Sequence, residues 1–63
     1  MPAILMELGP LEKEKKSILV KEVTESVSKA TGLPPQAIFV FIKENSLENI
    51  GVGGRLLSDR TEK

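Results

Sequence analysis

The sequence contains no cysteine and no histidine. The lack of cysteine excludes disulfides and thiolate metal sites, and without histidine any metal would depend on carboxylates alone. No acidic residues cluster at a spacing suited to that role. We therefore expect neither a bound metal nor a cofactor.

Tryptophan and tyrosine are also absent, and nine basic residues balance nine acidic ones to give a formal net charge of zero. Nucleic-acid-binding proteins usually show a basic excess or stripe, and here only Phe39 and Phe41 could stack on bases. No apolar run reaches the length of a membrane span, and the N-terminus lacks the basic region of a secretory signal. We expect a cytoplasmic protein that binds neither nucleic acid nor membranes.

Apolar residues, in contrast, make up 40% of the 63 residues, which we interpret as one domain spanning residues 1–63. A domain of this size buries only about 60% of the surface that its unfolded chain exposes. Such domains are usually reinforced by disulfides, a metal or oligomerisation. Since the first two are not expected here, self-association is the predicted reinforcement.

The first half of the chain predicts a strand followed by a helix. Residues 2–8 place apolar side chains on both faces, as in a parallel sheet, and Gly9-Pro10 ends the strand. From about Glu12 the apolar residues follow a helical period, and Gly32 with Pro34-Pro35 marks the end of the helix. The apolar stripe of this helix comprises Leu19, Val20, Val23, Val27 and Ala30.

Residues 38–42 are apolar and rich in β-branched side chains, which predicts a second strand. A strand, a helix of about 20 residues and a second strand form a β-α-β unit with parallel strands and a right-handed crossover. One helix covers one face of such a sheet, so the other face stays bare. That face carries either Phe39 and Phe41 or the alternate set Ile38, Val40 and Ile42. A bare apolar face indicates an interface between copies of the chain.

The tail after Asn45 predicts a turn and a tight hairpin, with Gly53-Gly54 between Val52 and Leu56. A phosphate-binding loop is the alternative, but neither a Lys-Ser/Thr pair nor a helix follows the glycines. The hairpin is too small to be stable alone, so we expect it to lie against another subunit. The predicted fold class is therefore α+β: a β-α-β protomer with a C-terminal β-hairpin, whose strands pair into larger sheets in an oligomer.

Pro2 is the candidate for chemistry. After removal of Met1 its nitrogen would be a terminal secondary amine that can accept a proton, whereas with Met1 attached it is a tertiary amide. An α-amino group titrates near pH 8, and burial in an apolar pocket lowers its pKa towards the range that suits a general base. Considered alone, a proline after the initiator methionine indicates only a processed terminus.

Taken together, these features resemble the 4-oxalocrotonate tautomerase family. The resemblance extends over residues 2–57, and its most specific part is the glycine-rich hairpin. The matching segments are Met1-Pro2, Lys15-Lys16, Glu22-Val23-Thr24-Glu25, Glu44 and Gly51-Val52-Gly53-Gly54. The resemblance implies pairs of protomers that share four-stranded sheets, and a hexamer built as a trimer of such dimers.

The resemblance also implies an isomerase that interconverts enol and keto forms of a small 2-hydroxydienoate or 2-keto acid, with Pro2 as general base and acid. Members that act on dicarboxylates typically carry arginines where this chain has Pro10-Leu11 and Phe39, and an aromatic residue where it has Ile50. Two charge-assisted carboxylate contacts are therefore expected to be missing. Desolvation by Leu8, Phe39 and Ile50 would have to lower the pKa of the Pro2 amine instead.

Among the basic residues, Arg55 is the first candidate for substrate binding, because the hairpin is expected at an interface. For Arg55, as for Lys13, Lys16 and Lys43, a solvated surface charge is the simpler interpretation. The predicted substrate-binding residues are thus Leu8, Phe39, Ile50 and Arg55. The alternative function is a catalytically silent oligomeric module of the same fold that binds an unknown small ligand or partner.

Overall fold

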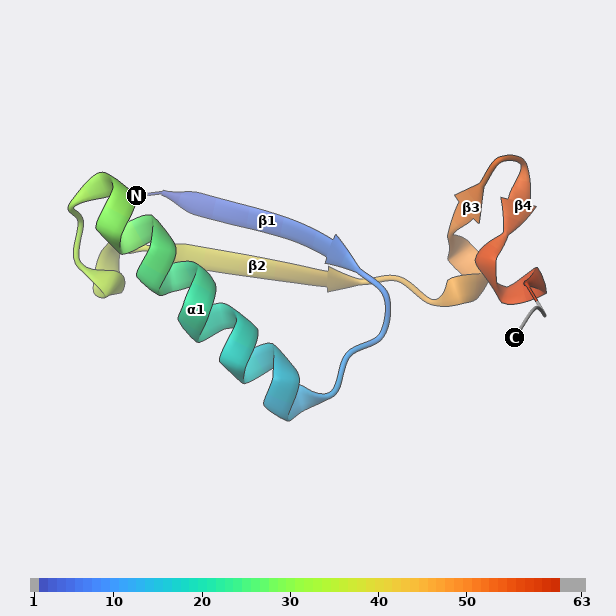
Figure 1. Ribbon diagram of the computed structural model, residues 1–63, viewed down its shortest axis with the longest axis horizontal. Coiled ribbons are helices and arrows are strands. Elements are labelled where there is room, and N and C mark those ends of the chain that lie inside the picture. The colour runs from blue at the N-terminus through green and yellow to red at the C-terminus, as the bar shows by residue number, and fades with distance from the viewer. Residues whose placement is uncertain (1, 61–63) are drawn as a thin grey trace.

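The computed structural model describes residues 2–60, so the predicted domain limits at residues 1 and 63 lie outside the described range. One long helix and four strands are joined by short connections and by single turns of 3-10 helix (Figure 1). The elements are β1 (Ala3–Leu8), α1 (Lys13–Thr31), β2 (Phe39–Glu44), β3 (Gly51–Val52) and β4 (Arg55–Leu56). The predicted order of strand, helix, strand and hairpin is confirmed.

Strands β1 and β2 pair in parallel, from Ala3 opposite Phe39 to Leu8 opposite Glu44. The second strand begins one residue later than predicted, because the N–H of Ile38 donates to the Pro35 carbonyl (3.1 Å) and closes a 3-10 turn. It also runs two residues further, since the pairing with β1 continues to Glu44. The parallel β-α-β unit places the amino ends of β1 and β2 side by side.

Helix α1 is capped at its carboxyl end by Gly32, whose φ of 76° is left-handed and whose N–H donates to the Ser28 carbonyl (2.8 Å). Glycine suits this position because it has no Cβ to oppose a left-handed backbone. The predicted stripe is half-buried except at Ala30, which is exposed. The prediction for Ala30 is wrong because Val27 and Ser28, both half-buried, occupy the inward side of the last turn.

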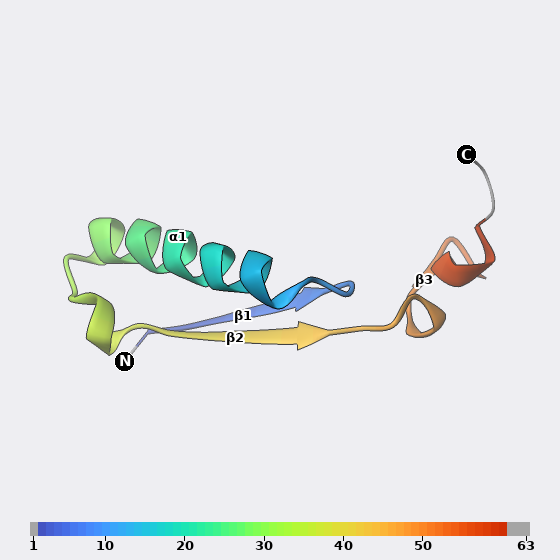
Figure 2. The ribbon, with the colours of Figure 1, turned by 90° about the horizontal axis from the view of Figure 1, so that it is seen from below.

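The sheet has one covered and one bare face, and α1 lies on the covered side (Figure 2). The half-buried side chains of the covered face are Ile4, Met6, Leu8, Val40 and Ile42. Ile38 is the one buried apolar side chain among residues 2–60, with 9% exposed. The core of the protomer is therefore a thin layer between α1 and the sheet.

The bare face carries the alternate residues, so the set that contains Phe39 and Phe41 is the exposed one. Leu5 is 76% exposed, Phe39 44% and Phe41 52%. Leu5 lies opposite Phe41 in the ladder, and Ala3 lies opposite Phe39. Glu7 and Lys43, also opposite each other, end this face at the carboxyl side of the strands.

The C-terminal segment, residues 46–60, forms an arm that extends beyond the carboxyl ends of β1 and β2 (Figures 1 and 2). Within it, β3 and β4 form an antiparallel hairpin, and Gly53 and Gly54 occupy the turn with φ of 62° and 85°. Two successive positive φ values define the type I′ turn that a two-residue hairpin loop requires. The predicted hairpin is confirmed.

The protomer is extended for its size. Its radius of gyration is 15.1 Å, whereas a compact chain of this length would have about 10.6 Å. Its accessible surface is 5086 Å², compared with about 4,000 Å² for a compact monomer of the same mass. The excess comes from the projecting arm and the bare sheet face, the two surfaces that the sequence predicts to be interfaces.

Candidate functional site

Pro2 lies at the amino end of β1 and is half-buried. Its carbonyl accepts a hydrogen bond from the Phe39 N–H (3.0 Å), which fixes the first residue of the described chain against the start of β2. Alternate residues of a strand point to the same face, so Pro2, two residues before Ile4, belongs to the covered face of the sheet. The sheet therefore holds this backbone in place at one edge of the protomer.

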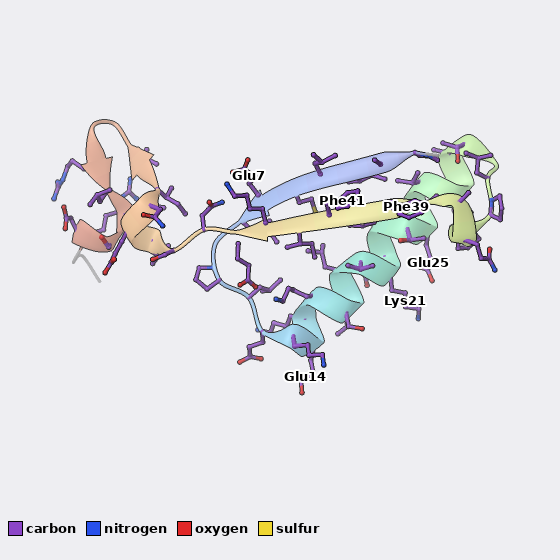
Figure 3. The ribbon with its side chains drawn as sticks, turned by 180° about the vertical axis from the view of Figure 1, so that it is seen from behind. Glu7, Glu14, Lys21, Glu25, Phe39 and Phe41 are labelled. Carbon is purple, nitrogen blue, oxygen red and sulfur yellow. The ribbon has the colours of Figure 1, made fainter. Side chains whose placement is uncertain are left out.

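Phe39 is the predicted substrate-binding residue that the structure brings close to Pro2. The backbone of Phe39 is bonded to Pro2, while its ring lies on the bare face beside Ala3. Figure 3 shows the rings of Phe39 and Phe41 along β2 on that face. Within one protomer, Phe39 therefore contacts Pro2 through its backbone, while its ring makes the amino end of the bare face apolar where dicarboxylate-specific relatives would carry an arginine.

Leu8, Ile50 and Arg55 lie far from Pro2 within the same chain. Leu8 is at the other end of β1, six residues or about 20 Å away along the strand, on the covered face. Ile50 and Arg55 belong to the arm, beyond that end of the sheet (Figure 1). Ile50 is half-buried, and its carbonyl accepts a hydrogen bond from the Leu57 N–H (2.8 Å), whereas Arg55 is exposed.

A single protomer therefore separates the predicted site residues into two groups. Pro2 and Phe39 lie at the amino ends of the strands, and Leu8, Ile50 and Arg55 lie at or beyond the carboxyl ends. Residues 2–60 of one copy enclose no pocket. A pocket that contains both groups requires more than one copy of the chain.

The carboxyl end of β2 holds the best-defined polar contacts. Lys16 Nζ lies 2.8 Å from Glu44 Oε2, so Lys16 is paired with a carboxylate rather than being a fully solvated charge. The hydrogen bond from Lys16 is the main reason why the pKa of Glu44 lies below its ordinary value; desolvation opposes it, and the positive charge of Lys16 and the nearby Leu11 backbone N–H lower the pKa further. The carboxylate is therefore ionised at neutral pH and paired with Lys16.

Asn45, next to Glu44, makes two contacts that the sequence did not indicate. Its N–H donates to the Leu8 carbonyl (2.7 Å), and its Nδ2 donates to Glu7 Oε1 (3.3 Å). From the sequence, Asn45 is expected only to begin the turn before the hairpin. The signal that could have identified it is its position directly after a strand, where an amide side chain can still bond the neighbouring strand.

The outer side of α1 carries charges that face solvent. Figure 3 shows Glu14, Lys21 and Glu25 pointing away from the sheet, and all three are exposed. Residues 2–60 contain no group of three or more Asp, Glu, His or Cys residues placed to hold a metal ion. In the same range, no helix is long and apolar enough to cross a membrane.

Comparison with known proteins identifies relatives over nearly the whole chain. A family model described as "Tautomerase enzyme" matches residues 4–60. A probable tautomerase of Bacillus cereus is 42% identical over 62 residues, which cover 95% of this chain and 100% of that protein. A 2-hydroxymuconate tautomerase of Bacillus subtilis is 36% identical over 61 residues, covering 94% of this chain and 97% of that one.

The fold has solved counterparts as well. The crystal structure of YwhB, a homologue of 4-oxalocrotonate tautomerase, matches with a TM-score of 0.88 at 34% sequence identity. The match covers 95% of this chain and 100% of that structure. The β-α-β unit with its C-terminal hairpin is thus the fold of these proteins.

Proposed function

Because this chain belongs to the tautomerase enzyme family, and so to the isomerases, we propose that it interconverts enol and keto forms of a small organic acid with Pro2 as general base and acid. The observation that carries the proposal is the position of Pro2. In a chain related to tautomerases over nearly its whole length, Pro2 is fixed against Phe39 at the head of β1.

The proposed reaction needs one group that both accepts and returns a proton. With Met1 removed, the neutral Pro2 nitrogen takes the proton of the enol hydroxyl, the O–H bond breaks and an enolate remains. The electron pair of its C=C bond then takes the proton from the Pro2 ammonium to form a C–H bond, while an oxygen lone pair forms the C=O bond and the N–H electrons return to nitrogen. The ring of proline restricts the direction of the lone pair, which favours transfer at both steps.

The site is proposed to be completed by neighbouring copies. The bare face and the extended shape support assembly, and we propose the hexamer, a trimer of dimers, that the family resemblance implies. In this assembly Leu8, Ile50 and Arg55 of adjacent protomers would surround Pro2 and Phe39. Leu8, Phe39 and Ile50 would exclude water, and Arg55 would bind the substrate carboxylate.

We propose that the substrate carries one carboxylate rather than two. Phe39 offers the bound acid an apolar ring, and an apolar or aromatic substituent would pack against it better than a second carboxylate, which would lose its hydration without a cationic partner. A 2-keto acid with an aromatic side chain, such as phenylpyruvate and its enol, is therefore a better candidate than 2-hydroxymuconate.

Replacement of Pro2 tests the proposal. In protein shown by intact mass to lack Met1, Pro2→Ala is expected to lower kcat/KM for phenylenolpyruvate ketonisation about 100-fold, because the primary amine of alanine is less well oriented. Pro35→Ala, at an exposed proline of the 3-10 turn, is the matched control and should leave the rate unchanged.

Two outcomes would contradict the proposal. Equal rates for the wild type and Pro2→Ala would show that another group is the base. A wild-type protein that lacks Met1 yet turns over neither phenylenolpyruvate nor 2-hydroxymuconate would favour the alternative, a module that binds without catalysis.

A further inference from the structure

Two consecutive residues, Glu44 and Asn45, join the sheet to the arm, and both are tied to neighbouring elements. The Glu44 carboxylate forms an ion pair with Lys16, whose Nζ lies 2.8 Å from Glu44 Oε2. Lys16 lies in α1. The end of β2 is therefore held to the helix side of the protomer.

Asn45 makes the corresponding contacts to β1. Its backbone continues the ladder by donating to the Leu8 carbonyl (2.7 Å), and its side chain donates to Glu7 Oε1 (3.3 Å). Glu7 belongs to the bare face, whereas Lys16 belongs to the covered side. Successive residues of an extended chain point to opposite faces. Glu44 therefore makes its contact on the covered side of the sheet, and Asn45 makes its side-chain contact on the bare face.

Beyond these two residues, the arm is bonded mainly to itself. Within residues 2–60, the hydrogen bonds of the arm run between its own residues, such as Asn49 N–H to the Ser46 carbonyl (2.7 Å). A methyl group of Leu47 does approach the body, 3.9 Å from where a Cβ at Gly9 would stand. The direction of the arm therefore depends chiefly on the backbone at residues 44 and 45.

From this arrangement we infer that Lys16, Glu44 and Asn45 form a clamp that sets the direction of the arm and so presents Ile50 and Arg55 to Pro2 of a neighbouring copy. That the clamp sets the direction of the arm follows from the contacts alone. That it presents Ile50 and Arg55 to a neighbouring Pro2 rests on the proposed function. The clamp residues are positioning residues, since none of them is proposed to touch the substrate. Loosening them leaves Pro2 intact but lets the arm move.

The direction of the arm can be measured without any activity. Because the sequence has no cysteine, Ser58→Cys gives a single labelling position in the arm. A fluorophore at residue 58 is expected to show lower anisotropy when Glu44→Gln or Asn45→Ala is added. Glu25→Gln, at an exposed carboxylate without an ion pair in residues 2–60, is the matched control and should not change it.

Steady-state kinetics on the unlabelled protein test whether the arm places Ile50 and Arg55 next to Pro2 of a neighbouring copy. Glu44→Gln and Asn45→Ala are each expected to raise KM for phenylenolpyruvate roughly threefold to tenfold, about the effect of losing one hydrogen bond, with kcat within about twofold. Arg55→Ala should raise KM as well, and adding Glu44→Gln to it should change KM little further. The exchange Lys16→Glu with Glu44→Lys restores the ion pair and should restore KM.

A lower kcat with an unchanged KM would overturn the inference, since it would mean that the clamp only maintains the fraction of folded protein. Unchanged anisotropy in both clamp variants would overturn it as well. If the wild type has no turnover but the anisotropy falls as expected, the proposed function fails while the clamp itself is supported.

Discussion

The two faces of the β1–β2 sheet are made from the same two strands, yet they have opposite surroundings. On the covered face, Ile4, Met6, Val40 and Ile42 are half-buried under α1. On the bare face, Leu5, Phe39 and Phe41 are 76%, 44% and 52% exposed. The apolar content of both faces is similar, so solvent exposure rather than composition distinguishes them.

This difference indicates that the chain encodes two kinds of core. The covered face is closed within one protomer by a helix that the same chain supplies. The bare face can be closed only from outside, and contiguous exposed apolar surface of this kind marks an interaction site. Substitutions on the covered face should therefore change protomer stability, and substitutions on the bare face should change assembly.

The largest expected effect comes from a charge on the bare face. Phe41→Glu is expected to dissociate the assembly to a chain of about 6.9 kDa in sedimentation, because the carboxylate would otherwise be buried without a partner. Turnover should fall more than about 100-fold, since the predicted site residues would then lie on separate molecules. Ser26→Glu, on the exposed side of α1, is the control and should remain assembled. A Phe41→Glu protein of unchanged mass would show that this face is not the interface.

The second prediction compares the same substitution, isoleucine to alanine, at a buried and at an exposed position. Ile38→Ala is expected to lower the free energy of unfolding by about 2–4 kcal/mol, because Ile38 is 9% exposed and its removal leaves a cavity. Ile18→Ala, at a position 57% exposed, should change it by less than about 0.5 kcal/mol. Urea denaturation at one fixed protein concentration measures both, because assembly makes stability concentration-dependent. Equal losses would mean that the covered layer is not the protomer core.

The third effect concerns the end of the bare face next to Pro2. Phe39→Arg is expected to raise kcat/KM for 2-hydroxymuconate about tenfold, since one charge-assisted hydrogen bond to a second carboxylate can supply that difference. The rate with phenylenolpyruvate should fall, because the apolar ring is lost. Phe39→Leu removes the ring without adding charge and is the control. If the assembly keeps its mass but turnover of the dicarboxylate does not rise, Phe39 does not determine the preference for a substrate with one carboxylate.

The smallest effect concerns the ion pair on the covered side. Because the pKa of Glu44 is lowered in the folded chain, its contacts with Lys16 stabilise the fold above the ordinary glutamate pKa of about 4.3. This contribution is lost as the pH falls through the lower, folded-state pKa. Between about pH 5 and pH 3 the wild type should therefore lose more stability than Glu44→Gln, as measured by urea midpoints. Added salt should reduce the difference, and parallel midpoint curves for the two proteins would show that the pair does not contribute.

Much of this fold follows from the order of apolar residues in the sequence. The change from an extended to a helical period predicts β1 and α1, and the stop at Gly32 and Pro34-Pro35 predicts the end of the helix. Gly53-Gly54 predicts the hairpin, because two positive φ values in succession suit glycine alone at low cost. These features are local, so each can be inferred from a few neighbouring residues.

Other features depend on contacts between distant residues and could not be inferred in this way. Both residue sets of the second strand are apolar, so its pattern does not say which one faces α1; the pairing of Ile4 with Val40 and the position of the helix decide it. The bond between Asn45 and Glu7 joins residues 38 positions apart and depends on the same register. The site itself could be predicted only as a set of residues, because one chain does not bring Pro2 together with Ile50 and Arg55.

The distance between Pro2 and the arm also has a consequence for how mutations act. In the proposed assembly, Arg55 serves a proline that belongs to another molecule. Where two alleles are expressed together, an altered arm would thus impair catalysis by unaltered chains, while its own Pro2 could be served by an unaltered arm. The unit on which selection acts would be the complex rather than the single polypeptide.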